Sequence, residues 1–572
     1  MEEIRQTAKW VVSEFDSAAV ELLASELEIP RALAQLLAQR GYSDPKVAEH
    51  FLHPRLSDLR NPFTLPDMST AVEHIWSAIR TDRNITVYGD YDVDGITSTT
   101  LMIKVLTVLG ANAVPFIPHR TDDGYGLSVD TLERCIAEHG TGLMITVDCG
   151  TSSTDAAEFA RQHGVDLIVT DHHEPSGEVC AAVAVVNPKL KDAGGDDWNL
   201  AGVGVAFKLC FALLKYAREN NLPFDEPDLR LFLDLVALGS VADIVPLVGE
   251  NRIFVSCGLR CMSITANVGL KALMDVSKIK QPLRTHHIAF QLAPRLNAAG
   301  RIGTASRALD MLLTDDPAEA LVIARELDEA NKHRRDIEKD VMAECERKID
   351  ATFNPETDYV IVIAGRGWHR GVVGIVASRI VRAHYRPVIV ISLDEEGGGH
   401  GSGRSIAGFN LVAALEKCAN NLKHFGGHAM AAGLELEGDK IDEFRERLNS
   451  IARSMMKADD LIPKQPVDAW INLEDVGEEL FEAQNMLAPC GAGNPGPVWA
   501  VAGVRFMGAP REVGKGHLKA VVGIGNTERN AIGFNMWNHD LPDGSFDMAF
   551  KLEKNEFRGR VTYQMNIQDI RY

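Results

Sequence analysis

The segment between residues 71 and 190 constrains the fold most strongly, because strand-like and helix-like runs alternate along it. The runs NITVYG, NAVPFIP, LMITVD and DLIVTD are short, apolar and rich in β-branched residues, as buried strands are. Between them lie ITSTTLMIKVLTVLG, SVDTLERCIAEHG and STDAAEFARQHG, which have helical spacing and end at glycine. Alternation with short turns predicts a parallel sheet covered by helices, an α/β layer fold.

Changes of composition divide the rest of the chain. DPAEALVIARELDEANKHRRDIEKDVMAECERKID contains no glycine and mixes charges of both signs, which predicts one long, partly exposed helix. YVIVIAG begins a second α/β unit, and five short strand-like runs after Pro463 predict a small β-barrel of the OB type. We therefore expect an N-terminal helical segment at 1–70, the first α/β domain at 71–250, a helical region ending in the connector helix at 251–350, the second α/β domain at 351–455 and the five-stranded barrel at 463–572.

Acidic and histidine side chains follow three of the predicted strands. Three aspartates alternate within VYGDYDVDG, one ends LMITVD, and DLIVT runs into an aspartate and two histidines. In open α/β sheets the carboxyl ends of the strands meet at one edge, so we expect these groups to converge although tens of residues separate them in sequence. The residues are Asp90, Asp92, Asp94, Asp148, Asp171, His172 and His173.

Such a cluster points to metal chemistry, because neighbouring carboxylates repel one another unless a cation holds them. Several carboxylates with one or two imidazoles suit Mn²⁺ or Mg²⁺, and the absence of paired cysteines argues against structural zinc. The aspartates exceed what one ion requires. We therefore expect two cations, roughly 3.5–4 Å apart with one bridging carboxylate, a pair that activates water to hydrolyse phosphate esters.

Simpler interpretations exist for each acidic residue taken alone. A lone aspartate after a strand is usually a turn former or a helix cap. Asp94 followed by Gly95 would by itself be an ordinary turn. Asp243 in GSVADIVPL is, from the residues alone, explained equally well as a helix end facing solvent. Only the coincidence of three acidic strand ends in one sheet favours the metal interpretation.

Composition limits the class of protein. Hydrophobic residues make up 45% and charged residues 24%, as in ordinary globular proteins, and no apolar run is long enough to cross a bilayer. The acidic N-terminus lacks the order of a signal peptide, and nine scattered cysteines without CxxC indicate reduced thiols, so we expect a cytoplasmic protein. The net charge of −21 argues against a generally basic nucleic-acid coat protein but not against a local basic groove.

Taken together, these motifs resemble the DHH phosphoesterase family. GDYDVDG, VDCG, TDHHE and GSVADIVPL look like its four successive motifs, while WHRGVVGIVASRI, GSGRSIAGFNLVAAL and HFGGHAMAAGLEL resemble the companion DHHA1 domain. IPHRTDDGYGL, LAGVGVAFKL, APRLNAAGRIG and the region that begins with APCGAGNPGP are similar to the bacterial RecJ exonucleases of that family. The resemblance implies a DHH catalytic domain, a DHHA1 substrate-binding domain joined to it by the long helix, and a C-terminal OB-type barrel.

The resemblance also implies roles for the clustered residues. Asp148 would bridge the two cations, and Asp90 would be either a direct ligand or a residue behind one. His173 would face the scissile phosphate, where it stabilises charge or protonates the leaving group. The implied metal ligands are Asp90, Asp92, Asp94, Asp148, His172 and Asp243, and the implied catalytic residues are Asp148 and His173.

Further residues are candidates for contact with nucleic acid. Small residues in GSGRS let a backbone approach an oxyanion, and Arg404 offers a forked donor, so we expect Ser402 and Arg404 to hold a terminal 5′ phosphate. Without the family, GSGRS and FGGH have a simpler interpretation as glycine-rich turns. The candidates for contact with DNA or phosphate are Arg120, Arg295, Arg301, Ser402, Arg404, Ser405, Gly426, Gly427 and His428.

The barrel combines basic and aromatic residues, which suit tracking and stacking of a single strand. For any one aromatic residue, however, a place in the barrel core is the better expectation. The residues concerned are Arg511, Lys515, His517, Lys519, Trp499, Phe534 and Trp537.

The activity that the resemblance implies is processive 5′→3′ hydrolysis of single-stranded DNA to 5′-mononucleotides, in recombination, mismatch repair and other DNA repair. Implied partners are single-strand-binding protein and a RecQ-type helicase, and we expect a monomer because no heptad stands out. Two alternatives remain: a hydrolase of very short oligonucleotides or cyclic dinucleotides, and a non-catalytic DHH scaffold. The barrel argues against the first, and the complete set of ligand positions argues against the second.

Overall fold

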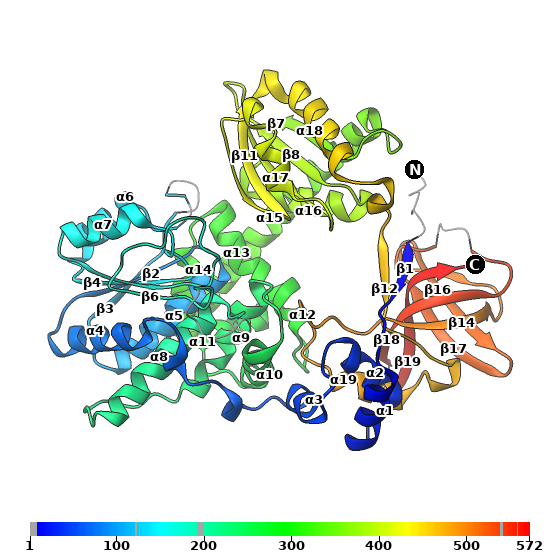
Figure 1. Ribbon diagram of the computed structural model, residues 1–572, viewed down its shortest axis with the longest axis horizontal. Helices are drawn as coiled ribbons and strands as arrows, with labels where there is room; N and C mark the ends of the chain where they lie inside the picture. The colour runs from blue at the N-terminus through cyan, green and yellow to red at the C-terminus, as the bar shows by residue number, and fades with distance from the viewer. Residues whose placement is uncertain (1–7, 120–122, 125, 191–198, 538–540, 558) are drawn as a thin grey trace. The chain divides into compact units, whose positions relative to one another are not determined.

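The chain folds into two compact units that interleave in sequence (Figure 1). The computed structural model describes residues 8–119, 123–124, 126–190, 199–537, 541–557 and 559–572. Unit 1 comprises Met1–Ser43, Lys332–Ala483 and Pro497–Tyr572, and unit 2 comprises Asp44–Asn331 and Gln484–Gly496.

A five-stranded parallel sheet forms the centre of unit 2, as the strand–helix alternation predicts. Its order is β3-β2-β4-β5-β6, and every pairing is parallel. The last strand of the sheet, β6, was not among the predicted strands, because three residues are too short for a periodic signal. The strands are β2 (Ile85–Gly89), β3 (Ala113–Phe116), β4 (Leu143–Val147), β5 (Asp166–Thr170) and β6 (Ala184–Val186).

Helices cover both faces of this sheet (Figure 1). The three predicted helices are confirmed as α5 (Val93–Val108), α6 (Val129–His139) and α7 (Thr154–Gln162). Successive strand residues point to opposite faces, so Val87 packs with α5, α4 (Met68–Arg80) and α8 (Gly202–Glu219), whereas Tyr88 packs with α6 and α7. Both faces are therefore dry, and the carboxyl edge is left for polar groups.

The remainder of unit 2 is helical. Its helices are α3 (Pro45–Leu52), α9 (Leu233–Ala242), α10 (Gly249–Met262), α11 (Val268–Val276), α12 (Thr285–His287), α13 (Ala293–Ile302) and α14 (Ser306–Leu313). The predicted long helix is confirmed as α15, 36 residues from Pro317 to Thr352, which begins in unit 2 and continues into unit 1. None of the helices in the described ranges has the length and apolar character that crossing a membrane requires.

Unit 1 contains the second α/β layer. Its sheet has the order β10-β11-β9-β8-β7, with β7 and β8 parallel and the other pairs antiparallel. Helix α16 (Arg370–His384) packs on one face, and α17 (Leu411–Glu416) and α18 (Ile441–Met455) pack on the other. The strands are β7 (Ile361–Arg366), β8 (Val388–Leu393), β9 (Gly398–Arg404), β10 (His424–His428) and β11 (Ala431–Glu437).

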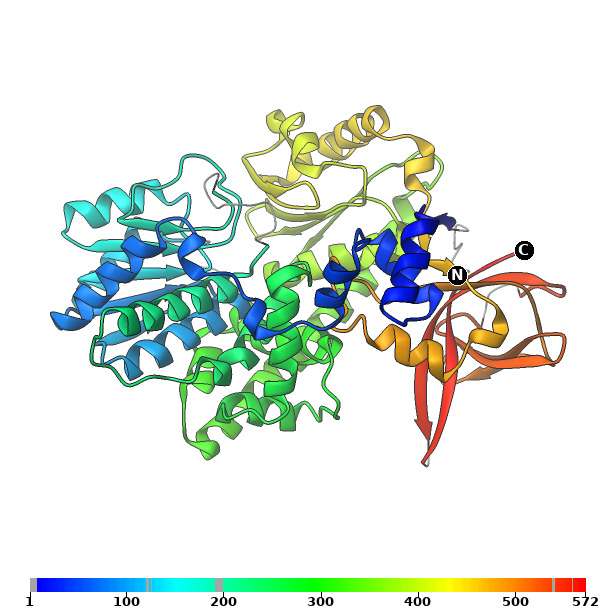
Figure 2. The ribbon, with the colours of Figure 1, turned by 60° about the horizontal axis from the view of Figure 1, so that its bottom comes forward.

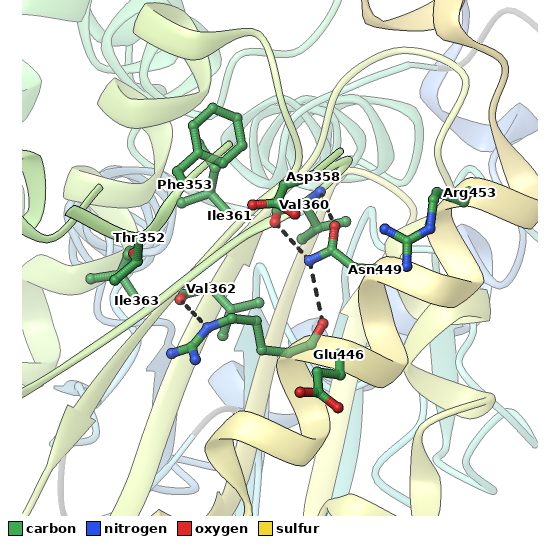
Figure 3. A pocket seen from close by; sticks show the side chains of 11 residues that line it. Thr352, Phe353, Asp358, Val360, Ile361, Val362, Ile363, Glu446, Asn449 and Arg453 are labelled. Carbon is green, nitrogen blue, oxygen red and sulfur yellow. Dashed lines mark hydrogen bonds between the residues drawn. The ribbon is translucent and has the colours of Figure 1, made fainter. Parts of the chain in front are cut away.

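Strand β7 is an edge strand of this sheet, and side chains occupy its outer backbone groups (Figure 3). Asn449 of α18 accepts from the N–H of Val360 and donates to its carbonyl oxygen, both at 3.0 Å. Arg445 Nε donates to the carbonyl of Val362, and Lys348 Nζ donates to that of Ala364. Side chains thus already occupy the carbonyls of Val360, Val362 and Ala364 along the 350 Å³ cavity beside β7, which hinders pairing with another strand.

Five strands near the C-terminus close into a ring, which confirms the predicted OB-type barrel (Figure 2). The sheet runs β14-β18-β19-β17-β16, and β14 pairs again with β16 through Arg505 and Phe506. Short strands β13 (Ala469–Trp470) and β15 (Arg511–Val513) extend it. The ring strands are β14 (Trp499–Phe506), β16 (His517–Ile524), β17 (Thr527–Gly533), β18 (Phe546–Phe557) and β19 (Arg560–Arg571).

The N-terminal region departs from the all-helical expectation. Helices α1 (Ser17–Glu26) and α2 (Arg31–Gln39) are present, but β1 (Lys9–Val12) precedes them and pairs in parallel with β12 (Lys464–Val467). Trp10 of β1 donates from Nε1 to Asp569 Oδ2 of β19 at 2.7 Å. The run KWVV is too short to reveal a strand whose partner lies at the other end of the chain.

Candidate metal centre

The ends of three strands and one helix bring all the predicted metal ligands into one cluster in unit 2. Asp90 follows β2, Asp148 follows β4, His172 follows β5 and Asp243 follows α9. Three groups have donor atoms that lie within 4.8 Å of one another: Asp94, His172 and Asp243; Asp90, Asp92 and Asp148; and Asp148, His172 and His173.

His172 and Asp148 are central to this cluster. The Nε2 of His172 lies 3.1 Å from Asp148 Oδ1, 3.6 Å from Asp243 Oδ2 and 3.9 Å from Asp94 Oδ2. Asp148 belongs to two of the three groups, one with the aspartates after β2 and one with the histidines. A carboxylate at this position lies within reach of donors from both groups.

The backbone around Asp94 is arranged to hold a buried carboxylate. Asp94 is in the first turn of α5, and its two oxygens accept from the N–H groups of Gly202 and Val203 at 2.7 and 2.9 Å. These N–H groups begin α8, whose N-terminal dipole favours a negative charge. A β-carbon on Gly239 would come within 2.7 Å of Asp94 Oδ1, so glycine is required for this approach.

Asp148 is held by an unusual backbone. Its φ is +64°, in the left-handed region that non-glycine residues rarely adopt, and a β-carbon on Gly202 would meet its carboxylate at 2.7 Å. Such conformations cost about 1–3 kcal/mol and are found mainly at functional sites. Asp92 has two roles, because its Oδ1 also caps α5 through the N–H groups of Asp94 and Gly95. The simpler interpretation as a helix cap is thus correct for one of its oxygens.

The electrostatics of the cluster match a cation site. Burial, and then the neighbouring carboxylates, raise the pKa values of Asp94, Asp148 and Asp243, that of Asp243 to about 7. Burial and the charge of His173 lower the pKa of His172 to about 4, so its imidazole is neutral. Asp148 Oδ1 and His172 Nε2 are buried and form no hydrogen bond with the described residues. These oxygen and nitrogen donors fit divalent cations such as Mn²⁺ and Mg²⁺.

His173 differs from His172 because Asp171 orients it. Its Nδ1 lies 2.7 Å from Asp171 Oδ1, which also accepts from both histidine N–H groups. Burial lowers the pKa of His173, but the hydrogen bond and the charge of Asp171 outweigh it and raise the pKa to about 9. His173 is therefore a cation near neutral pH. Asn187 completes the support by donating to the His173 carbonyl at 2.9 Å.

The predicted phosphate contacts Ser402 and Arg404 lie on β9 in unit 1. The glycines at 399, 401 and 403 face the side of the sheet that α17 and α18 cover. Because successive residues of a strand alternate, His400, Ser402 and Arg404 face the opposite side, which α16 covers. Arg404 Nη1 donates to Ser402 Oγ at 3.1 Å. A β-carbon on Gly374 of α16 would meet Ser402 Oγ at 2.9 Å and Arg404 Nη2 at 3.0 Å, so glycine there lets the helix approach both groups.

A cavity of about 370 Å³ opens beside this face of β9. Ser402 and Gly426 line it, together with Arg370 at the start of α16. Additional β-carbons on Gly426 and Gly433 would meet nothing within 4 Å, so this part of the sheet surface is open. Gly427, whose φ is +137°, and the exposed His428 follow on β10.

Other predicted contacts lie elsewhere. Ser405 is buried, and its hydroxyl donates to the Phe409 carbonyl at 2.7 Å, away from the face that carries Ser402. Arg295 is held by Asp328 at 2.9 Å in unit 2. Arg301 is half-buried on α13, and Arg120 lies outside the described residues.

The barrel aromatics divide as the sequence suggests. Trp499 is fully buried in the core, whereas Phe534 is 50% exposed beside the ring of His517, with centroids 5.2 Å apart. Trp537 and Lys519 are half-buried, and Arg511 and Lys515 are exposed.

Sequence reasoning missed the residues that support the cluster. It noted Asp171 as a strand end but did not assign it to His173, and it gave no role to Gly202, Gly239 or Asn187. Gly239 lies in GSVADIVPL, four residues before Asp243, and Gly202 lies in LAGVGVAFKL, so the available signal was a glycine inside a family motif.

Comparisons with known proteins agree with this geometry. Residues 84–240 match the N-terminal domain of the DHH family, residues 357–454 match the DHHA1 domain, and residues 467–569 match the RecJ OB domain. The single-stranded-DNA-specific exonuclease RecJ of Bacillus subtilis is 38% identical over 575 residues, which cover 98% of this chain and 70% of that protein. The enzyme of the same name from Escherichia coli is 37% identical over 573 residues, 95% of this chain and 96% of that protein.

Solved structures agree as well. The crystal structure of Thermus thermophilus RecJ in complex with Mn²⁺ is similar with a TM-score of 0.84 and 30% identity, covering all of this chain and 80% of that one. The complex of the same protein with Mg²⁺ has a TM-score of 0.79 and 29% identity, with 100% and 79% coverage. The chain therefore belongs to the RecJ family of exonucleases.

Proposed function

We propose that this chain is a metal-dependent exonuclease that hydrolyses single-stranded DNA processively from the 5′ end and releases 5′-mononucleotides, in DNA recombination and repair. The observation that carries the proposal is the set of three donor groups, which are linked through Asp148 and His172. The donor set suits two divalent cations, Mn²⁺ or Mg²⁺, and the similarity to proteins named as single-stranded-DNA-specific exonucleases supports the substrate.

In this proposal the cluster would hold the ions, and His173 would act on the substrate. One ion would be held by Asp94, His172 and Asp243, the other by Asp90 and Asp92, with Asp148 shared. When bound, the cations lower the pKa of water and neutralise charge on phosphate oxygens. His173, protonated and oriented by Asp171, would donate a hydrogen bond or a proton to the leaving oxygen.

Polarity and end recognition would come from unit 1. Ser402 and Arg404 present a hydroxyl and a guanidinium on one face of β9, and charged donors of this kind bind phosphate strongly. Gly426, Gly427 and His428 would let the strand backbone lie close to the sheet, and Arg120, Arg295, Arg301 and Ser405 stay candidate contacts.

We further propose that the chain is a monomer, that it is divided into the five regions predicted from the sequence, and that its partners are single-strand-binding protein and a RecQ-type helicase. The nine cysteines form no disulfide, which supports a reducing compartment and a cytoplasmic site of action.

A labelled-strand assay tests the function. A long single strand labelled at the 5′ end, the same strand labelled at the 3′ end, and a blunt duplex are incubated with Mn²⁺ or Mg²⁺ and with EDTA. Labelled mononucleotide should appear at once from the 5′-labelled strand only, and EDTA should abolish it. Early release of the 3′ label, or digestion limited to oligomers of a few nucleotides, would contradict the proposal.

Replacing Arg404 by glutamine should remove the preference for a 5′ phosphate. Loss of one charged hydrogen bond costs roughly 1.5–3 kcal/mol, so kcat/KM on 5′-phosphorylated strands should fall about 10- to 100-fold, while strands with a 5′ hydroxyl change little. Arg447→Gln is the matched control, because it removes the same charge from α18 on the opposite face of the sheet. An equal loss on both kinds of end would assign Arg404 a role other than end recognition.

A further inference from the structure

A cavity of about 650 Å³ lies in unit 2, apart from the carboxylate cluster. Its walls are the chain after α3, the C-terminal half of α10, and the turn Asn485–Ala488. On α10 the lining begins at Ser256, about two turns beyond the start of the helix. None of the predicted metal or phosphate contacts that lie in the described ranges lines this cavity, so the proposed nuclease function leaves it unexplained.

A buried arginine joins the three walls. Arg252 is 1% exposed, and its guanidinium carbon lies 3.9 Å from the centre of the Phe51 ring. Its nitrogens donate to five carbonyl oxygens, those of Phe51, Met486, Leu487, Ala488 and Pro489, at 2.6–3.3 Å. The partial negative charges of these carbonyl oxygens would repel an anion. The guanidinium of Arg252, which is held in place by the five hydrogen bonds, offsets this repulsion. The cavity is thus rigidly built and favours negative charge.

The side chains that line the cavity are basic or apolar. Arg55, Arg260 and His53 line it, and among the described residues no aspartate or glutamate does. This is notable in a chain with 80 acidic and 59 basic residues. Both arginines are exposed, and within the described part of the chain neither forms an ion pair; Arg260 donates only to the Cys257 thiol at 3.1 Å. Their guanidinium groups can therefore bind an anion without breaking a salt bridge.

We propose that this cavity binds the phosphate of a nucleotide unit. The two arginines supply forked donors that match phosphate oxygens, and His53 adds a third donor. Leu52, Pro54 and Met486 offer apolar surface for the sugar and base, and the volume is in the range of small-ligand sites. The shared chemistry could come from a free nucleoside monophosphate or from one unit of a single strand. The proposal stands on these residues and does not rest on the proposed nuclease activity.

Equilibrium binding in EDTA tests the site without catalysis. The wild-type chain and the double variant Arg55→Gln/Arg260→Gln are each titrated with dAMP by calorimetry. Both are also titrated with fluorescent (dT)₁₂ by anisotropy. The control is Arg161→Gln/Arg307→Gln, which removes the same two charges from unit 2 at arginines that carboxylates already pair. If the source is free nucleotide, we expect the Arg55→Gln/Arg260→Gln variant to bind dAMP at least tenfold more weakly than the wild type does. If the source is a strand, the slope of log affinity against log salt for (dT)₁₂ should be about 1.4 less negative for the Arg55→Gln/Arg260→Gln variant than for the wild type.

Both double variants are checked for unchanged Tm, and a second measurement needs no variant. Photocrosslinking of the wild-type chain with 8-azidoadenosine 5′-monophosphate should label peptides containing residues 52–56 or 256–260. Affinities and salt slopes that match those of the control for both ligands would overturn the proposal. Crosslinks found only in other peptides would overturn it as well.

Discussion

Replacing Asp148 by asparagine is expected to lower metal-dependent nuclease activity at least about 1000-fold while raising the Tm of the metal-free protein. Asp148 is 2% exposed and belongs to two of the three donor groups. Loss of its charge should weaken both cation sites together, and a thousandfold loss corresponds to about 4 kcal/mol of transition-state stabilisation.

The rise in stability follows from the sign of the pKa shifts. Burial, and then the charges of Asp94 and Asp92, raise the pKa of Asp148. A carboxyl whose folded pKa is raised stabilises the fold at low pH, and this stability is lost as the pH rises through the folded pKa. In EDTA the wild-type Tm should therefore fall between pH 5 and pH 8, the range that includes the pKa of about 7 for Asp243. The Tm of the asparagine variant should fall less over this pH range, because the variant has one buried charge fewer.

The measurements are a strand-digestion assay with Mn²⁺ and a thermal melt in EDTA at both pH values. Relief of about 1 kcal/mol of repulsion would raise the Tm by roughly 1.5 °C in a unit of about 300 residues. Asp225→Asn is the matched control, because Asp225 is exposed in unit 2 after α8 and pairs with none of the described residues. A variant that loses activity and also melts at lower temperature in EDTA would indicate a structural role for Asp148 instead.

Substitution at His173 should give the second large effect. His173→Gln removes the group that would protonate or stabilise the leaving oxygen, and such groups contribute about 100- to 10,000-fold to the rate. The loss should appear in kcat rather than in KM. Metal affinity, measured by calorimetry, should change little in comparison with His172→Gln, which removes the imidazole that lies 3.1 Å from Asp148.

Asp171→Asn separates orientation from direct catalysis. Asp171 raises the pKa of His173 to about 9, so loss of its charge should lower that pKa. If the protonated imidazole is the active form, activity falls at high pH, and the alkaline limb of the kcat profile should lie at lower pH in the variant than in the wild type. A limb at unchanged pH would show that His173 does not control this ionisation.

The sheet and its acidic edge could be predicted from the sequence because both depend on local signals. The β-branched runs define the strands, and a residue that follows a parallel strand must lie at the carboxyl edge. This is why Asp90, Asp148 and His172 could be placed together across more than eighty residues of sequence. Asp243 could not be placed this way, because it follows a helix and its position depends on how α9 packs.

The supporting residues escaped prediction for a different reason. Gly202 and Gly239 matter because a β-carbon would strike Asp148 or Asp94, and such contacts exist only after distant elements have packed. The orientation of His173 likewise depends on which oxygen of Asp171 faces it. Composition and periodicity report burial and turns, but they do not report which side chains meet across a fold.

The pairing of β1 with the C-terminal part of unit 1 has a consequence for synthesis. Trp10 and its partner Asp569 are 559 residues apart in sequence. At roughly 5–20 residues per second, the ribosome needs about half a minute to two minutes to deliver that partner. The backbone partner of the strand, β12, comes sooner, because Lys9 pairs with Lys464, so β1 stays unpaired for roughly 25 to 90 seconds, while most of unit 2 is already complete. A nascent chain therefore exposes Lys9–Val12 to a chaperone or to another strand until β12 has been made.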